Sequence, residues 1–223
     1  MAITLTGSPS GNHTTGAMNL TVSHANAGDY LVVGLYVAGL VGAYTQLSCT
    51  YNSVAMTRYN QIGYDDGGSW RRSVTMWGLA APASGTYDIY IETTSESTPM
   101  IAIAQSFSGV HQTTPPNAPS GGTYTSGASY VTSPRGLDVV SSAGNLIVDC
   151  VGLYDKPDTS YAVAGDNTLI DFYDPWVRIA GMSYAAGAAN VNMDWQWTTN
   201  TDIVTLAAIE LLPVGVVAGT MWL

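Results

Sequence analysis

The eight residues VNMDWQWT (191–198) alternate strictly between apolar and polar side chains. One parity holds all the large apolar members, which are Val191, Met193, Trp195 and Trp197. A period of two is typical of a β-strand with one buried face and one face toward water. The stretch TYDIYIET (86–93) repeats the pattern, with Tyr87, Ile89 and Ile91 on its apolar side. Both stretches predict strands of an antiparallel sheet.

Four further segments are apolar on both parities, which indicates central strands buried on two faces. They are YLVVGLYV (30–37), MIAIAQSF (100–107), NLIVDCVGL (145–153) and DIVTLAAIEL (202–211). Turn-rich connectors such as YDDGGS (64–69) and APASG (81–85) separate the predicted strands, and no segment predicts a helix of three turns. We therefore expect an all-β protein, an antiparallel β-sandwich of two layers that forms a single domain over residues 1–212.

Two parts of the chain resemble one another. AGDYLV (27–32) corresponds to AGNLIV (143–148), and IAIAQSF (101–107) corresponds to VTLAAIE (204–210). Small-residue turns containing Ala80 and Ala185 precede related strands in both halves. Two such halves predict a jelly roll or a related double Greek key sandwich. The alternative, that a glycine-rich β protein simply repeats its turns, stays open.

Composition limits the partners. The chain has 223 residues, of which 46% are hydrophobic and 10% charged, so it can bury a well-packed core. Its net charge is −10, with 6 Lys and Arg against 16 Asp and Glu. Nucleic-acid binding needs clustered basic residues, so we expect no nucleic-acid partner. The start of the sequence, MAITLTGSPSGN, does not resemble a secretion signal, and no run is long enough to span a bilayer. We expect a soluble product of cytoplasmic synthesis with no membrane partner.

Metal and cofactor sites are not predicted. Cys49 and Cys150 are too few for a zinc site, and we interpret them as two buried thiols, although a bridge between them stays open. An Asp-rich stretch lacks the ligand spacing of a calcium loop, so solvated loops are expected and weak cation binding is left open. Its members are Asp155, Asp158, Asp166, Asp171 and Asp174.

Catalytic groups are also not predicted. His13, His24 and His111 lie outside any nucleophile motif and are interpreted as solvated or structural histidines near loops. The three glutamates, Glu92, Glu96 and Glu210, lack the paired arrangement of a glycosidase and are interpreted as surface charges.

Aromatic residues beside turns are the candidates for an exposed binding surface, because sugar-binding modules present Trp and Tyr rings to solvent. The candidates are Tyr64, Trp70, Tyr154, Tyr173 and Trp176. Their alternative role is the packing of loops against the sandwich.

Residues 213–223 are expected to form an apolar C-terminal tail. Its run VGVVAGTMWL (214–223) has no charged side chain and is too short to cross a bilayer. An apolar tail of this kind is explained by docking, either on its own sandwich or on a neighbouring subunit, and we favour the neighbour. The candidate interface residues are Val214, Val216, Val217, Met221, Trp222 and Leu223.

Three segments resemble a recurrent β-sandwich domain of tailed-bacteriophage structural proteins and bacterial surface proteins. They are YNSVAMTRY (51–59), MWGLAAPASGTYDIYI (76–91) and SFSGVHQTTPPNAP (106–119), and AGNLIVD (143–149) extends the match weakly. The corresponding patterns are Y-x-G-x-A-M-T, W-x-L-x-x-P-x-x-G-x-Y and S-F-x-G-V-x-Q-x-x-P. Ser53 stands where the pattern commonly has Gly. The family brings no agreed catalytic residues.

This resemblance implies a non-enzymatic virion structural protein. Because no export signal is recognised, the bacteriophage branch fits better, and we expect a capsid decoration (cement) protein on the outer capsid surface. Its implied partners are the major capsid protein and copies of itself, commonly as a trimer. The alternative is a glycan- or receptor-binding module of a tail fibre or surface adhesin. A polysaccharide-degrading enzyme that uses Glu92, Glu96 or Glu210 ranks last.

Overall fold

The computed structural model describes residues 2–40, 47–65, 70–93, 98–113, 117–125, 135–154, 161–166, 168–173, 178–197 and 203–215. All regular elements in these ranges are β-strands, and every strand pair is antiparallel. The predicted all-β class and antiparallel sandwich are confirmed, while the jelly-roll form stays a prediction. The strands form four sheets, not the two expected.

The first half of the chain builds two sheets. The first inner sheet has the order β1-β9-β3-β7-β6, and the first outer sheet has the order β2-β8-β4-β5. The strands are β1 (Thr4–Ala17), β2 (Asn19–Asn26), β3 (Tyr30–Leu40), β4 (Leu47–Tyr51), β5 (Val54–Ala55), β6 (Thr57–Asp65), β7 (Trp70–Ala80), β8 (Gly85–Thr93) and β9 (Thr98–Ser108).

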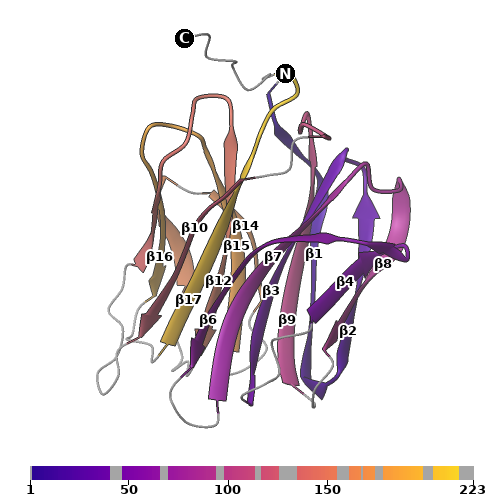
Figure 1. Ribbon diagram of the computed structural model, residues 1–223, viewed down its shortest axis with the longest axis vertical. Helices are drawn as coiled ribbons and strands as arrows, with labels where there is room; N and C mark the ends of the chain where they lie inside the picture. Colours follow the sequence, from indigo (N-terminus) through magenta and orange to yellow (C-terminus); the bar gives the residue numbers. More distant parts are fainter. Residues whose placement is uncertain are drawn as a thin grey trace.

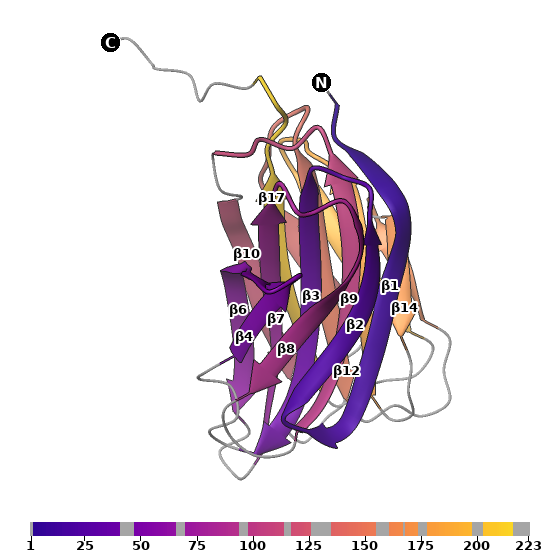
Figure 2. The same ribbon diagram turned by 90° about the vertical axis from the view of Figure 1, so that its right-hand side faces the viewer.

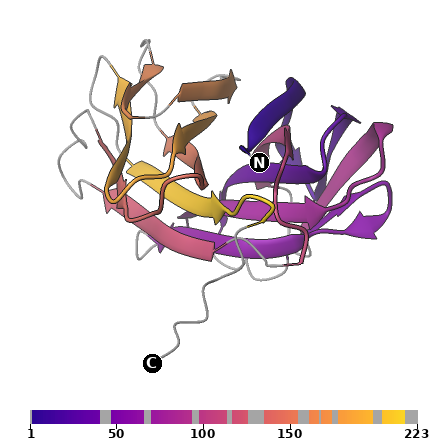
Figure 3. The same cartoon turned by 90° about the horizontal axis from the view of Figure 1, so that it is seen from above.

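The second half repeats this plan. The second inner sheet has the order β10-β17-β12-β15-β14, and the second outer sheet has the order β11-β16-β13. The strands are β10 (Asn117–Thr125), β11 (Arg135–Val139), β12 (Leu146–Tyr154), β13 (Tyr161–Gly165), β14 (Thr168–Tyr173), β15 (Arg178–Ala186), β16 (Val191–Trp197) and β17 (Ile203–Leu211). Each inner-sheet strand therefore has a counterpart at the same place in the other half, and Figures 1 and 3 show the two halves side by side.

Both faces of the inner sheets are buried, which explains the continuously apolar segments. On β3, Tyr30, Val32 and Tyr36 pack in a central core between the two inner sheets. Leu31 and Val33 point the other way, into a core shared with the first outer sheet. An equivalent core lies between the second inner and second outer sheets. The hydrophobic effect thus requires cover on two sides of each inner sheet, and the two outer sheets provide it.

The outer sheets show the alternation expected from the sequence. On β16, Val191, Met193, Trp195 and Trp197 are all buried, and the residues between them are less so. On β8, Ile89 and Ile91 are buried and the intervening residues are exposed. Tyr87 has the same parity as these isoleucines but lies near the start of the strand, where it stays partly exposed. The outward faces of these strands are therefore the polar surface of the molecule.

Candidate functional site

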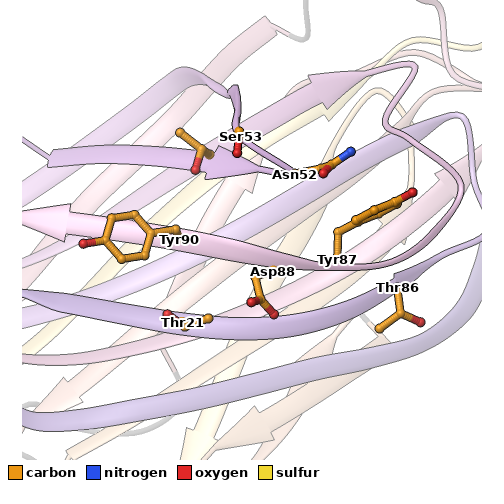
Figure 4. A pocket seen from close by; sticks show the side chains of 8 residues that line it. Thr21, Asn52, Ser53, Thr86, Tyr87, Asp88 and Tyr90 are labelled. Atoms are coloured by element: carbon orange, nitrogen blue, oxygen red, sulfur yellow. The ribbon is translucent and has the colours of Figure 1, made fainter.

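A shallow depression of about 510 Å³ lies on the outward face of the first outer sheet. Figure 2 shows β2, β8 and β4 of this sheet toward the viewer, and Figure 4 shows the depression from close by. Its lining residues are Thr21, Thr50, Asn52, Ser53, Thr86, Tyr87, Asp88 and Tyr90. Hydroxyl, amide, carboxylate and phenol groups dominate this set, so the depression is suited to a polar ligand with hydrogen-bonding groups.

The register of three strands places the lining side chains in rows. Tyr90 on β8 is paired with Thr21 on β2 and with Thr50 on β4. Two residues earlier, Asp88 has the same parity as Tyr90, and its carbonyl oxygen accepts a hydrogen bond of 3.1 Å from the backbone N–H of Asn52. Neighbouring strands lie about 4.8 Å apart and rows about 7 Å apart. The strands thus hold these groups at fixed spacings.

Tyr87 stands at the edge of the depression against a buried aromatic ring. Its ring meets Tyr51 edge-on at 5.8 Å between centroids. The Tyr51 hydroxyl lies 3.2 Å from the Ala83 carbonyl oxygen and 3.0 Å from that of Gly85. Burial is the main cause that raises the pKa of Tyr51, so its hydroxyl stays protonated and donates. These contacts fix the β7–β8 connection and the ring of Tyr87.

The turn between β4 and β5 forms another wall and is strained. Asn52 and Ser53 have φ of 48° and 63°, in the left-handed region. Two consecutive positive φ values in a two-residue hairpin are typical of a type I′ turn, in which Asn is favoured first and Gly second. Ser53 therefore occupies a position where glycine would cost less, and its hydroxyl faces the depression.

The lining carries a negative charge. Among the described residues that line the depression, Asp88 is the sole carboxylate and there is no Lys, Arg or His. Tyr87 and Tyr90 are 38% and 37% exposed, so both rings are available to a ligand. A neutral ligand fits this arrangement better than an anionic one.

This site was not predicted from the sequence. Tyr87 was expected on the apolar side of its strand, and no binding role was expected for Thr21, Asn52, Asp88 or Tyr90. The signal was present in the alternation of TYDIYIET (86–93), since Asp88 and Tyr90 have the parity opposite to the buried Ile89 and Ile91. The outward parity of a half-buried strand is the surface that a ligand can reach.

The candidate aromatics lie elsewhere, and four of them occupy strand ends instead of loops. Tyr64 is in β6, Trp70 begins β7, and Tyr154 and Tyr173 end β12 and β14. Trp176 lies outside the described residues. The exposure predicted for these side chains stays a prediction.

The register brings these four positions to one end of the sandwich. In the first inner sheet, Trp70 pairs with Leu40 at the end of β3. In the second, Tyr154 pairs with Arg178. Strands β3 and β12 run in the same direction across the central core, because Gly152 abuts Tyr36 just as Gly34 abuts Cys150. The strand ends that carry the aromatics therefore coincide, away from the depression.

The candidate interface tail begins at a fixed root. Val214 is 45% exposed, and its N–H donates to the Gly109 carbonyl oxygen at 2.9 Å. Val110 and Pro213 form a β-bridge, and the His111 N–H donates to the Leu212 carbonyl oxygen at 2.7 Å. The other predicted interface residues, Val216, Val217, Met221, Trp222 and Leu223, lie outside the described part of the chain.

His24 lies near a strand end, as predicted, two residues before the end of β2, but it is buried within the strand and is not a loop histidine. Its Nε2 is 2.8 Å from Ser106 Oγ and its Nδ1 is 3.0 Å from Ser10 Oγ. The Ser106 hydroxyl donates to Asn26 Oδ1 at 2.6 Å, so it accepts from the imidazole. Burial lowers the pKa of His24, which keeps the ring neutral. The Ser–His pair is thus used within the interior and does not form an activated nucleophile.

The predicted surface position of Glu210 is wrong. Glu210 is buried at the end of β17, and its Oε1 accepts hydrogen bonds from Ser141 Oγ at 2.5 Å and Asn145 Nδ2 at 2.6 Å. Glu92 is exposed on β8, and Glu96 lies outside the described residues. Glu92 and Glu210 stand on different sheets in different halves, so they do not form a carboxylate pair.

Asp149 is a buried carboxyl group that the sequence analysis passed over. It lies in the core of the second half and accepts hydrogen bonds from Ser183 N–H at 3.2 Å, Ser183 Oγ at 2.5 Å and Trp195 Nε1 at 2.8 Å. Burial outweighs these bonds and raises the pKa of Asp149 to about 7. The signal was an aspartate within the apolar run NLIVDCVGL (145–153).

Cys49 and Cys150 are both free and buried. Cys49 packs in the core between the first inner and outer sheets, and Cys150 packs in the central core. The first inner sheet separates them, so the structure excludes the bridge that the sequence left open.

Within the described ranges, no three His, Cys, Asp or Glu side chains are grouped so as to hold a metal ion. In the Asp-rich stretch, Asp166 accepts a hydrogen bond of 2.9 Å from the Asn192 N–H, which ties the end of β13 to β16. Asp155, Asp158 and Asp174 are not among the described residues. The residues that the structure describes include no helix long and apolar enough to cross a membrane.

No family model, curated protein or solved structure matches this chain.

Proposed function

We propose that this chain is a non-enzymatic structural protein of a bacteriophage particle, a capsid decoration protein that lies on the outer shell. It works by adhesion, to the major capsid protein and to further copies of itself, in the trimers that the resemblance implies. The proposal rests on the resemblance of the sequence motifs, on the charge of the chain and on the position at which its apolar tail begins.

The motif residues have structural roles that explain why a fold family would share them. The Tyr51 hydroxyl hydrogen-bonds to the β7–β8 connection, and Met56 packs in the core between the first inner and first outer sheets. Gly109 adopts a positive φ of 82°, and its N–H donates to Asp29 Oδ2 at 2.9 Å. The Oε1 of Gln112 accepts a hydrogen bond of 2.8 Å from the Ala81 N–H. The resemblance is therefore one of architecture, and it supports a shared scaffold role.

The single observation that carries the proposal is the anchored root of the apolar tail. Residues 212–214, which follow the last strand of the second half, are bonded to residues 109–111, which follow the last strand of the first half. Ten residues without a charged side chain thus start from a fixed and exposed point. Such a segment gains free energy by burying its apolar groups on another subunit. The net charge of −10 favours a place away from packaged DNA.

Two experiments test the proposal. Cryo-electron microscopy of purified particles should show density for this chain on the outer shell. Density at a tail-fibre tip, or particles that lack the chain, would refute the capsid assignment. In solution, analytical ultracentrifugation should show an oligomer that Trp222→Ser dissociates, while the matched tail change Thr220→Ser leaves it intact. A wild-type chain that is monomeric at micromolar concentration would remove the role given to the tail.

A further inference from the structure

We propose that the depression on the first outer sheet is a binding site for a neutral sugar, such as a hexose residue of a surface polysaccharide. Asp88 accepts hydrogen bonds from the sugar hydroxyls, and the rings of Tyr90 and Tyr87 pack against its C–H groups. This goes beyond the shell-binding role and does not depend on it, because it uses the outward face of β2, β4 and β8 instead of the root of the tail.

The rings of Tyr87 and Tyr90 match the shape of a sugar. A pyranose ring has an apolar patch of C–H groups on its face and hydroxyl groups around its edge. Tyr fits such a ligand because its ring is apolar and its hydroxyl is polar. In Figure 4, Tyr90 and Tyr87 stand on either side of Asp88. A sugar above Asp88 would therefore touch an aromatic ring while its hydroxyls point to the sheet.

The polar side chains of the depression match the hydrogen-bonding capacity of a sugar. A sugar hydroxyl both donates and accepts, so it needs partners of both kinds. The carboxylate of Asp88 only accepts, and bonds to it are strengthened by its charge. Thr21, Thr50, Thr86 and Ser53 add hydroxyls, and the Asn52 side chain adds an amide with both functions. This set matches a polyol and offers little to an apolar ligand.

The charge of the lining selects neutral sugars. Asp88 is the sole carboxylate among the described lining residues, and no basic side chain balances it. A sugar acid or a sulfated sugar would be repelled by this carboxylate. The site therefore discriminates between neutral and acidic glycans by electrostatics.

The site is formed before the ligand arrives. Thr21, Thr50 and Tyr90 sit on paired strands, and Tyr51 fixes the ring of Tyr87. The turn holds Ser53 at φ 63°, where glycine would be less strained, and so keeps a hydroxyl at the wall of the depression. Groups on rigid elements lose little entropy on binding. The depression is open, so one site should bind weakly, with a Kd on the order of 1 mM.

The test uses the full-length chain and defined probes. Maltotriose, cellotriose, mannotriose and 3′-sialyllactose would be titrated into ¹⁵N-labelled protein and followed by NMR. We expect at least one neutral trisaccharide to bind, with amide shifts centred on Asn52, Asp88 and Tyr90, and no binding of sialyllactose. Asp88→Asn and Tyr90→Ala should weaken binding at least tenfold. The matched control Glu92→Gln also changes a carboxylate to an amide on the same face of β8, and it should bind as the wild type does.

Tyr90→Phe separates the two roles of that residue, since it keeps the ring and should bind far better than Tyr90→Ala. The substituted side chains are exposed, and unchanged thermal unfolding of each variant would confirm an intact fold. The proposal is overturned if no neutral probe binds at 10 mM, about ten times the expected Kd, if binding survives both Asp88→Asn and Tyr90→Ala, or if sialyllactose binds best. A failure here leaves shell density in particles unaffected, so the two proposals fail separately.

Discussion

The contact of Gly152 with Tyr36 is the sharpest test of how the two halves are joined. Gly152 lies on β12 and Tyr36 on β3, on opposite sides of the central core. A Cβ added at Gly152 would lie 2.0 Å from Tyr36 Cδ2 and 2.6 Å from Cε2. Carbon atoms normally pack at about 3.5 Å or more. Gly152→Ala therefore requires a displacement of about 1.5 Å, from a ring that is buried and enclosed.

The expected cost follows from this overlap. Overpacking of a rigid core costs about 1–3 kcal/mol, and the short distance places this case near the upper end. For a chain of this size, 1 kcal/mol corresponds to about 2–4 °C in Tm. We expect Gly152→Ala to lower Tm by about 6–12 °C. Differential scanning calorimetry at fixed pH and protein concentration would measure it.

Gly63→Ala is the matched control, because an added Cβ there meets its nearest atoms at 3.5 Å and 3.6 Å, in ordinary contact. Its Tm should change by less than about 2 °C. Adding Tyr36→Leu to Gly152→Ala should recover part of the loss, with a coupling energy of about 1 kcal/mol or more. A Gly152→Ala protein that melts within 2 °C of the wild type, by the same conversion, would mean that the inner sheets do not meet as described.

Three further predictions concern other groups. Ser53→Gly should stabilise the protein by roughly 0.5–1 kcal/mol, because glycine adopts the left-handed backbone conformation without strain. The change should raise the urea midpoint and weaken sugar binding. An unchanged midpoint would contradict the strain at Ser53. Burial raises the pKa of Asp149 from 3.8 to about 7, so between these pH values the folded state holds a proton that the unfolded state has lost. The contribution of Asp149 to the free energy of unfolding is therefore fully present below about pH 4, falls as the pH rises to about 7 and is constant above that. This fall in the free energy of unfolding amounts to roughly 4 kcal/mol. Urea unfolding measured from pH 4 to 8 should show the fall in the wild type and not in Asp149→Asn. If the free energies of the two proteins change with pH in parallel, the assignment is disproved. Burial raises the pKa of the Cys49 thiol to about 12 and that of the Cys150 thiol further. Ellman's reagent at pH 8 should therefore detect both thiols only after denaturation. A reaction of either thiol in the native protein would show that the core around it is open to solvent.

The two halves use equivalent positions for different polar groups. Leu31 on β3 pairs with Ser106, and Ile147 on β12 pairs with Glu210. Ser106 bonds to Asn26 and His24, whereas Glu210 accepts bonds from Ser141 and Asn145. Both clusters lie near the start of the central strand of their half, β3 or β12, between the inner and the outer sheet. A repeated architecture therefore tolerates different side chains where each buried polar group finds its own partners.

The strands with a clear hydrophobic pattern, and most of their buried faces, follow from the sequence alone. Alternation in VNMDWQWT (191–198) identified four buried side chains, and the continuous run YLVVGLYV (30–37) identified a strand buried on both faces. These patterns can be predicted because side-chain direction in a strand has a period of two, and apolar groups must leave water wherever the strand lies. The corresponding halves were visible as recurring turns and strands, since a repeated supersecondary unit repeats its local chemistry.

Four layers instead of two, and the site on the outermost one, were decided by the tertiary structure. A strand that is apolar on both faces needs a packed sheet on each face, but its sequence does not identify those sheets. Cys49 and Cys150 therefore could not be assigned to different cores from the sequence. Likewise, Thr21 and Tyr90 are distant in the chain and become neighbours only through the register of β2 and β8. Periodicity is a local property of a strand, whereas the pairing of strands depends on contacts between residues far apart in the sequence, and the sequence pattern does not encode those one by one.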